Sequence, residues 1–516
     1  MKASTLKSIY SLVKPNYTSV RAITVQANAT HITEQQSLKD WREIPGPSGI
    51  PFLGQIRHFL PGGEFYNMNF EKMFENLYNK YGSIVKFDAI LGKLPFIIVF
   101  DPDTCAHVLR SENWMPVRTG FETLEYYRTK YEHNESTKTK FEPNVQSTGL
   151  LTEHNDAWKQ FRSTVNPVML HSKTIQQYSN NLDEVAQDMI ARLRYLRGPK
   201  NTIESDFEME MNLWALESIA LVSLGRRLHC FSRDLPPDSP EKRLIKVVHD
   251  IFHVADALDI KPSIWRYYGT KTFKKAMNLY KEQERLTRYF IDETIKDLEK
   301  QKINKSEEEK SVLEKLLSFD KNLAVIMASD SLFAGVDTTS NTITGTLYQL
   351  ARNQDKQDKL REELFSDSEK KPYLKACIKE SMRIMPIITG NMRKTTKEYD
   401  LHGYRIPKGF QISVMHQQMS RMESQYPQAK KYLPERWVVN KDDPLHYGNA
   451  SPFATQPFGF GVRSCIGRRI AELEMEVFLS KIIKNFKVEW FGPPIKVESS
   501  GLNYIKGPFN FTFTDL

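Results

Sequence analysis

The chain has 516 residues, of which 40% are hydrophobic and 26% are charged, and this balance excludes wholesale disorder and a fibrous architecture. No stretch approaches the roughly 18 uninterrupted apolar residues that a membrane-spanning helix needs. The four cysteines are scattered along the chain, which argues against a disulfide scaffold and a zinc finger and fits a reducing compartment.

Part of the net charge of +9 lies at the N-terminus, where the first 33 residues hold four basic side chains and no acidic one. Leu6, Ile9 and Val13 recur there at helical spacing, and Pro15 ends the predicted helix. A basic amphipathic start without acidic residues is typical of a mitochondrial transit peptide, and a disordered basic tail is the alternative. We therefore predict a transit peptide and flexible leader over residues 1–40 and a single folded domain over residues 41–516.

The folded part is expected to be mainly α-helical with small β-sheets (α+β). Residues 41–54 contain three prolines and three glycines, which predicts a stiff, extended entry to the domain. Residues 83–88 and 94–100 have the alternation of a pair of strands. Residues 172–301 follow a mostly helical pattern, residues 322–353 predict one long helix without proline, and short strands return towards the C-terminus.

The most informative segment is the glycine-rich loop of residues 458–467, which contains a single cysteine, Cys465. Apolar residues at helical spacing follow it, so the cysteine is expected at a helix N-terminus, where backbone N–H groups favour a thiolate. A lone thiolate shielded by an aromatic such as Phe458 suits an axial iron ligand, and Arg463 could pair with a haem propionate. The alternative is a buried structural cysteine beside a flexible loop. A dinucleotide-binding fingerprint is excluded because position 464, where its third glycine would stand, is a serine.

This loop resembles the signature F-x-x-G-x-R-x-C-x-G of the cytochrome P450 family at every fixed position. The resemblance runs from about residue 45 to the C-terminus. It implies the P450 fold, a helix-rich body with a long central helix and a β-rich lobe, and haem b (iron protoporphyrin IX) as the cofactor. It also implies that Cys465 is the axial ligand of the haem iron and that Phe458, Gly461 and Arg463 belong to the cofactor site.

Other segments match family motifs in the expected order. One is a Trp–Arg pair at i, i+4 and another a Glu–Arg pair at i, i+3, and both pairs share a helical face. Read alone, each of these charged residues would more often be a solvated surface group. The resemblance assigns Trp158, Arg162 and Arg393 to the haem propionates and Glu380, Arg383 and Arg436 to a buried structural cluster.

The centre of the predicted long helix carries a third motif. A glycine inside a helix costs about 1 kcal/mol relative to alanine, so Gly335 needs a reason. Beside a haem it would leave room for dioxygen, while the Thr338 hydroxyl could donate a hydrogen bond to it and Asp337 could feed protons through water. The alternative is a packing glycine beside a threonine satisfied by the carbonyl four residues earlier. The resemblance to the family motif A/G-G-x-D/E-T-T favours the catalytic roles.

The resemblance implies a P450 monooxygenase that inserts one atom of O2 into a lipophilic small molecule, either a xenobiotic or a steroid-like compound. Oxygen activation needs two external electrons, and nothing in the chain resembles a flavin or nicotinamide domain, so a partner must deliver them. Lys375 and Lys379, at i, i+4, resemble the pair with which mitochondrial P450s dock an acidic ferredoxin, and an ordinary basic helix face is the alternative. We therefore expect an adrenodoxin-like mitochondrial ferredoxin with its NADPH-dependent reductase as partners.

Further segments resemble the insect mitochondrial P450s associated with xenobiotic oxidation, which implies a location on the matrix side of mitochondria. No transmembrane helix and no nucleic-acid partner are expected, and peripheral contact with the inner membrane is compatible with the sequence. Only residues 365–371 separate two predicted helices that most relatives join by a longer connection. Two other functions stay open: a haem-thiolate isomerase or dehydratase, which needs no electrons, and a non-catalytic haem-binding protein such as a sensor.

Overall fold

The computed structural model describes residues 38–51, 53–88, 95–118, 120–131, 148–203, 206–232, 236–260, 263–301, 305–499 and 502–516. The chain divides into two units, Met1–Leu38 and Lys39–Leu516, and the predicted transit peptide lies almost wholly outside the described residues. Strand β1 (Lys39–Asp40) pairs in parallel with β6 (Tyr404–Ile406). Residues 39 and 40 therefore belong to the folded unit, although the predicted boundary places them in the leader.

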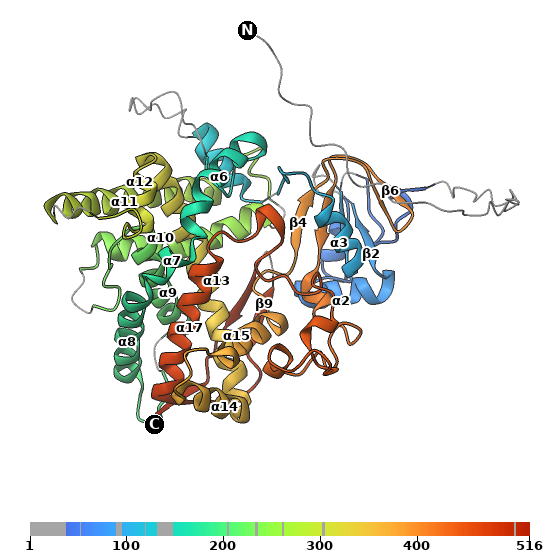
Figure 1. The fold of residues 1–516 in the computed structure, drawn as a ribbon. Helices are drawn as coiled ribbons and strands as arrows, with labels where there is room; N and C mark the ends of the chain where they lie inside the picture. Colours follow the sequence, from blue (N-terminus) through green and yellow to red (C-terminus); the bar gives the residue numbers. More distant parts are fainter. Residues whose placement is uncertain are drawn as a thin grey trace, which may run out of the picture. The chain divides into compact units, whose positions relative to one another are not determined.

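The second unit is mainly α-helical with small sheets, as predicted (Figure 1). Its described helices are α1 (Ile56–Phe59), α2 (Phe70–Tyr81), α3 (Pro102–Arg110), α4 (Glu122–Tyr126), α6 (Asn155–Met169), α7 (Ser172–Gln176), α8 (Ser179–Leu196), α9 (Phe207–Ser223), α10 (Pro240–Ala255), α11 (Lys271–Gln301), α12 (Val312–Leu317), α13 (Lys321–Arg352), α14 (Gln354–Phe365), α15 (Pro372–Ile384), α16 (His416–Met419) and α17 (Arg468–Asn485). The strands after β1 are β2 (Ile84–Phe87), β3 (Phe96–Val99), β4 (Asn391–Lys394), β5 (Tyr399–Leu401), β6, β7 (Gln411–Val414), β8 (Phe486–Trp490), β9 (Lys496–Ser499), β10 (Asn503–Lys506) and β11 (Phe511–Asp515). Among the described residues, no helix has the length and the apolar character needed to cross a membrane.

The long helix α13 agrees with the helix predicted over residues 322–353 to within one residue at each end. Its N-cap is Asp320, whose carboxylate accepts the backbone N–H of Leu323 over 2.8 Å. Helices α9, α11, α15 and α17 pack against α13, and most of its residues are buried. Figure 1 shows α13 and α17 side by side in the helix-rich part of the unit. An accessible residue in the middle of α13 is therefore an exception that needs an explanation.

The largest described sheet has the strand order β2-β3-β7-β4. Strands β2 and β3 form the predicted pair and run antiparallel, with Ile84 opposite Val99. The next pairing joins segments far apart in the sequence, because β3 runs parallel to β7 with Phe96 opposite Gln411. Strand β4 then pairs with β7 and places Arg393 opposite Ile412. The sheet thus brings Arg393 close to the segment that follows α3.

Candidate active site

The loop that carries Cys465 is closed by its own backbone. The N–H of Cys465 donates a hydrogen bond to the carbonyl oxygen of Phe458 over 2.8 Å. Gly459 and Gly461 have φ angles of 73° and 67°, a left-handed conformation that glycine adopts without strain. The cysteine lies just before α17, whose N-cap is Gly467, and the Gly467 N–H donates to the cysteine sulfur. The loop and the helix start therefore hold the sulfur in a fixed position.

Cys465 is accessible, whereas the other three cysteines of the chain are buried. Protein still surrounds most of its sulfur, and this burial raises the pKa of the Cys465 thiol. The Gly467 N–H and the charges of Arg162 and Arg118 oppose that rise. A metal cation bound to the sulfur would favour the thiolate far more strongly than these groups do. Cys465 thus has the accessibility and the environment of a ligand that ionises when it binds a metal.

Four arginines gather around the cysteine loop: Arg162, Arg393 and Arg463, which the motifs indicated, and Arg118, which they did not. Burial lowers the pKa of Arg463 to about 9, and the charges of the other three arginines add to this effect. Burial also lowers the pKa of Arg162 to about 10, with Cys465 opposing and Arg118 adding. The pKa of Arg118 is lowered by burial and by the charge of Arg393. This mutual repulsion marks an excess of buried positive charge, which calls for anionic partners.

Arg463 is held by backbone carbonyls and by an aromatic ring. Its Nε donates to the carbonyl of Pro116 over 2.9 Å, and its Nη atoms donate to the carbonyls of Leu150 and Glu153 over 3.3 and 3.1 Å. The guanidinium carbon lies 3.7 Å from the ring centroid of Trp158 in α6. The indole that was expected to reach a propionate is thus covered by Arg463. Arg463 joins three chain segments around the cysteine loop.

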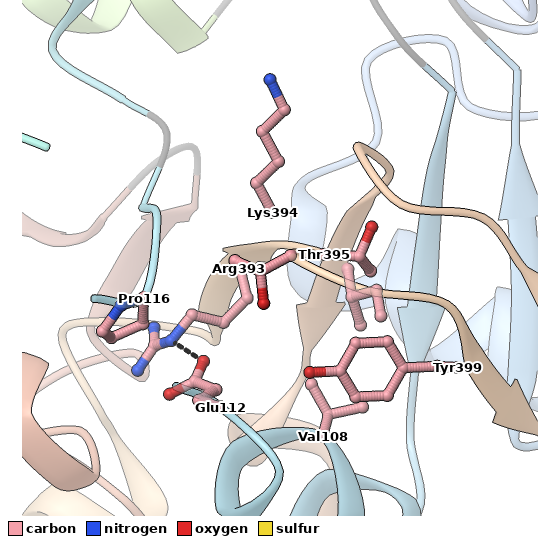
Figure 2. Close-up of a pocket in the computed structure, with 9 residues that line it drawn as sticks. Val108, Glu112, Pro116, Arg393, Lys394, Thr395 and Tyr399 are labelled. Atoms are coloured by element: carbon pink, nitrogen blue, oxygen red, sulfur yellow. Dashed lines mark ion pairs between the residues drawn. The ribbon is translucent and has the colours of Figure 1, made fainter. Parts of the chain in front are cut away.

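The other arginines keep unused hydrogen-bonding capacity. Arg162 of α6 donates from Nη2 to the carbonyl of Ser464 over 2.9 Å, but its buried Nε has no hydrogen-bond partner. The Nε of Arg393 in β4 forms an ion pair with Glu112, as Figure 2 shows. Arg118 forms no hydrogen bond or ion pair with another described residue. Free donors and excess positive charge fit the two carboxylates that a haem supplies as propionates.

The middle of α13 has an accessible face. Ala334 is exposed and Thr338, one turn later, is partly exposed. The Thr338 hydroxyl donates to the carbonyl of Ala334 over 2.7 Å. Its proton is therefore satisfied within the helix, as the alternative interpretation anticipated, while its oxygen can still accept a hydrogen bond. A small side chain and a hydroxyl oxygen share this face of the helix.

Gly335 has a different role from the one predicted. A Cβ added at Gly335 would lie 3.0 Å from Cγ1 of Ile219 in α9. The space beside the glycine is filled by Ile219, so it does not open towards a ligand, and its effect is close packing of α13 on α9. Ala334 is the small residue that lies on the accessible face instead.

Asp337 lies deep in the fold and is 5% exposed. Burial raises the pKa of Asp337 to about 7, with the charge of Glu208 adding to the rise and that of Lys506 opposing it. Lys506 and Glu208 form an ion pair of 2.6 Å. The strand that carries Lys506 is tied to α13, because the N–H of Ile505 donates to Oδ1 of Asn341 over 2.8 Å. A buried carboxyl group with a pKa near neutrality can take up and release a proton under physiological conditions.

The structure brings Glu380, Arg383 and Arg436 together, and all three are fully buried. Arg383 donates to both carboxylate oxygens of Glu380 over 2.9 and 2.7 Å, and Nε of Arg436 donates to one of them over 3.1 Å. The indole of Trp437 and the N–H of Leu433 donate to the same carboxylate. The cluster joins α15 to the short helix η4 (Pro434–Trp437) and acts as a structural connection.

Lys375 and Lys379 are both exposed on α15. Nζ of Lys375 lies 3.5 Å from a carboxylate oxygen of Glu476 in α17. Nζ of Lys379 lies 5.6 Å from the ring centroid of Trp437. Each lysine thus has a neighbour within the chain that offsets the repulsion between them, and both remain accessible to a partner.

The short connection between α14 and α15 is tied to both helices. The carboxylate of Glu363 accepts the N–H groups of Tyr373 and Leu374 at the start of α15 over 2.8 and 2.9 Å. Nζ of Lys371 donates to the carbonyls of Glu363 and Ser366 over 2.7 and 3.0 Å. These bonds satisfy the helix ends that face each other, so the short connection leaves both helices intact.

Comparison with known proteins decides the family. The sequence model of the cytochrome P450 family matches residues 44–513. The chain belongs to the cytochrome P450 family. It is 38% identical to cytochrome P450 CYP12A2 of Musca domestica, with 95% of this chain and 94% of that protein aligned. It is 36% identical to the mitochondrial cytochrome P450 12b1 of Drosophila acanthoptera, with 90% and 87% aligned. The crystal structure of the cytochrome P450DA haem domain shares the fold, with a TM-score of 0.68 at 18% identity over 92% of this chain and 97% of that one.

As a P450, the protein is a haem-thiolate monooxygenase with iron protoporphyrin IX as its cofactor. Relatives named as mitochondrial confirm the mitochondrial assignment made from the basic leader and the lysine pair. The motifs missed Arg118, because it lies in a loop after α3 where no periodic pattern indicates its direction. They also missed Glu112, which follows the C-cap of α3 and belongs to none of the motifs.

Proposed function

We propose that this P450 inserts one atom of O2 into a lipophilic small molecule and receives its electrons from a mitochondrial ferredoxin with its NADPH-dependent reductase. The observation that carries the proposal is the accessible Cys465 among buried arginines that have unused donors. One metal-bound thiolate and two carboxylates would satisfy this arrangement, and a haem offers all three contacts at once.

The bound haem supplies the chemistry of oxygen activation, and the side chains of the chain hold it and move protons. In this proposal Cys465 provides the thiolate for the iron. Arg118, Arg162 and Arg393 have the donors to hold the propionates. Arg463 contributes charge and fixes the loop segments around them through its three carbonyl contacts.

Asp337 and Thr338 are proposed to deliver protons. Asp337 can hold a proton at neutral pH, because burial raises the pKa of its carboxyl group to about 7. Thr338, the next residue along α13, keeps a free acceptor on its hydroxyl oxygen. The ion pair of Glu208 and Lys506 lies at only intermediate burial, so it offers a polar connection between Asp337 and solvent.

The substrate class is inferred from aromatic residues around α13. The ring of Phe333, which precedes the accessible Ala334, stacks on Phe252 of α10 with centroids 4.5 Å apart. It also meets the ring of Phe121 edge-on at 5.2 Å. Aromatic side chains next to the accessible part of α13 favour a lipophilic compound over a charged one. Both xenobiotic and steroid-like molecules belong to this class.

Peripheral contact with the inner membrane is supported by one surface segment. Ile264, Tyr267 and Tyr268, between α10 and α11, are 52%, 76% and 70% exposed. Apolar and amphipathic side chains of this kind favour a membrane–water interface.

Reconstitution of the purified protein tests the proposed function. With a mitochondrial ferredoxin, its reductase and NADPH, a lipophilic substrate should be converted to a product that carries one oxygen atom from ¹⁸O-labelled O2. Omission of the ferredoxin should abolish product formation. Turnover of a peroxide substrate without any electron donor would instead favour an isomerase or dehydratase. Haem binding without turnover of any lipophilic compound tested would favour a sensor.

Replacing Lys379 with glutamate should raise the KM for an acidic ferredoxin about tenfold or more, because complementary charge accelerates encounter by this order of magnitude. Lys379 is suited to the test because it is exposed and its Nζ lies over the ring of Trp437. The measurement is the KM for ferredoxin at low and high ionic strength. Lys271→Glu on α11, which lies well away from α15 in Figure 1, is the matched charge-reversal control. Equal effects of the two variants, or no effect of Lys379→Glu, would contradict docking at α15.

A further inference from the structure

Glu112 is a buried carboxylate that faces the arginines of the active site. It follows the C-cap of α3, and its side chain is 12% exposed. Its Oε1 forms an ion pair with Nε of Arg393, and neither atom has another hydrogen-bond partner. Figure 2 shows the two side chains pointing towards each other, Glu112 from the segment after α3 and Arg393 from β4.

The surroundings of this ion pair are narrow. The adjoining cavity, lined by Val108, Pro116 and Ile412 among others, has a volume of about 10 Å³. A cavity of this size holds one water molecule at most, so water contributes little to solvating the pair. Arg393 is therefore the partner that holds the Glu112 carboxylate in place.

Charge around the site is unbalanced without Glu112. The charges of Arg118 and Arg393 lower the pKa of Arg463, and the charge of Arg393 also lowers the pKa of Arg118. Glu112 is the acidic group that counters this effect at Arg463. Burial raises the pKa of Glu112, and the charges of Arg393 and Arg463 oppose that rise and so favour its anionic form.

We propose that Glu112 is a positioning residue that fixes Arg393 and sets the reduction potential of the haem by limiting the positive charge at the propionate side. This inference rests on the proposed haem site. Reduction of ferric to ferrous haem adds one electron and no other charge. Buried positive charge near the haem stabilises the added electron, and a buried carboxylate opposes it, because both interactions are strong at low effective dielectric constant. Glu112 therefore holds the potential below the value that the four arginines alone would give.

The Glu112→Gln variant tests this inference, because it keeps the shape of the side chain and removes its charge. Potentiometric titration of the holoprotein with dithionite should give a midpoint potential more positive than that of the wild type. Glu112→Asp, which keeps the charge, should return the potential most of the way. Arg393→Gln should shift the potential in the opposite direction. Asp103→Asn removes an exposed carboxylate from the other end of α3 and should leave the potential unchanged.

A potential that is unchanged or more negative in Glu112→Gln would overturn the inference. A purely structural role would also fail to give opposite shifts for Glu112→Gln and Arg393→Gln. If one of the two variants binds no haem, the sign of the potential shift in the other variant still tests the inference. Failure of the proposed function has a different signature, because the wild type would then bind no haem or would lack a thiolate-ligand spectrum.

Discussion

Replacing Glu380 with glutamine is expected to destabilise the folded chain by about 3–5 kcal/mol, the range for removing one partner of a buried ion pair. The carboxylate accepts hydrogen bonds from Arg383, Arg436, Trp437 and Leu433. A neutral amide cannot compensate the two guanidinium charges, which would remain buried without the carboxylate that both contact. Urea unfolding of the purified variant, followed by circular dichroism, measures the loss.

A matched control exists on α11, where Glu282 and Arg285 form a two-hydrogen-bond pair at the same i, i+3 spacing. That arginine is 53% exposed, so water replaces most of the lost interaction, and Glu282→Gln should cost less than about 1 kcal/mol. If the two substitutions cost the same, Glu380 does not act as the buried counterion described here.

Replacing Asp337 with asparagine is expected to slow substrate oxidation about 10²-fold, the lower end of the range for losing a positioned acid or base. Asparagine preserves the size of the side chain but cannot release a proton. Because the pKa of Asp337 is raised to about 7, the wild type should lose activity as pH rises above 7 and the carboxyl group ionises. The variant should lack this limb of the pH profile. Turnover at saturating ferredoxin across this pH range is the measurement.

Asp320→Asn is the control for this substitution, because it makes the same chemical change at the N-cap of the same helix, and asparagine caps as well as aspartate does. Its turnover and pH profile should match those of the wild type. Equal rates for wild type and Asp337→Asn at every pH would remove Asp337 from the proton path.

The raised pKa of Asp337 also makes the free energy of unfolding depend on pH. An unfolded aspartate has a pKa of about 3.9, so between this value and about 7 the folded chain binds more protons than the unfolded chain. As far as Asp337 is concerned, the folded chain has its full stability at low pH, where this residue is neutral. It loses part of this stability as pH rises to about 7, because the carboxyl group ionises in the unfolded chain while the buried one keeps its proton. The stability of Asp337→Asn relative to the wild type should therefore increase as pH rises from about 4 to 7, by a few kcal/mol in total, and stay constant at higher pH.

The site residues that were predicted from each short motif lie close together in the structure. The cysteine loop, α13 and the Glu380–Arg383 pair each depend on local spacing, so their sequences indicate which side chains share a face. Hydrogen bonds from a side chain to backbone carbonyls leave no such pattern in the sequence. Arg463 binds three carbonyls and Arg383 binds the carbonyls of Ser420 and Ala429, and any residue could have stood at those positions.

Contacts between distant segments could not be predicted for the same reason. Strand β3 finds β7 rather than any other strand because tertiary packing selects the pairing. In α9, Glu210 and Glu217 are buried, and only the folded chain shows that Arg192 and Arg227 pair with them. Gly335 illustrates the limit most clearly, because its motif indicated the helix correctly but not that Ile219 fills the space beside it.

The absorption spectrum of the ferrous protein with carbon monoxide tests most directly whether Cys465 is the thiolate ligand of a haem. The wild type should show the strongly red-shifted Soret band of a thiolate-ligated haem, and Cys465→Ala should lose it. Cys377→Ala, at a buried cysteine, should keep it. A wild type that lacks the band after haem loading, or a Cys465→Ala variant that retains it, would contradict the account.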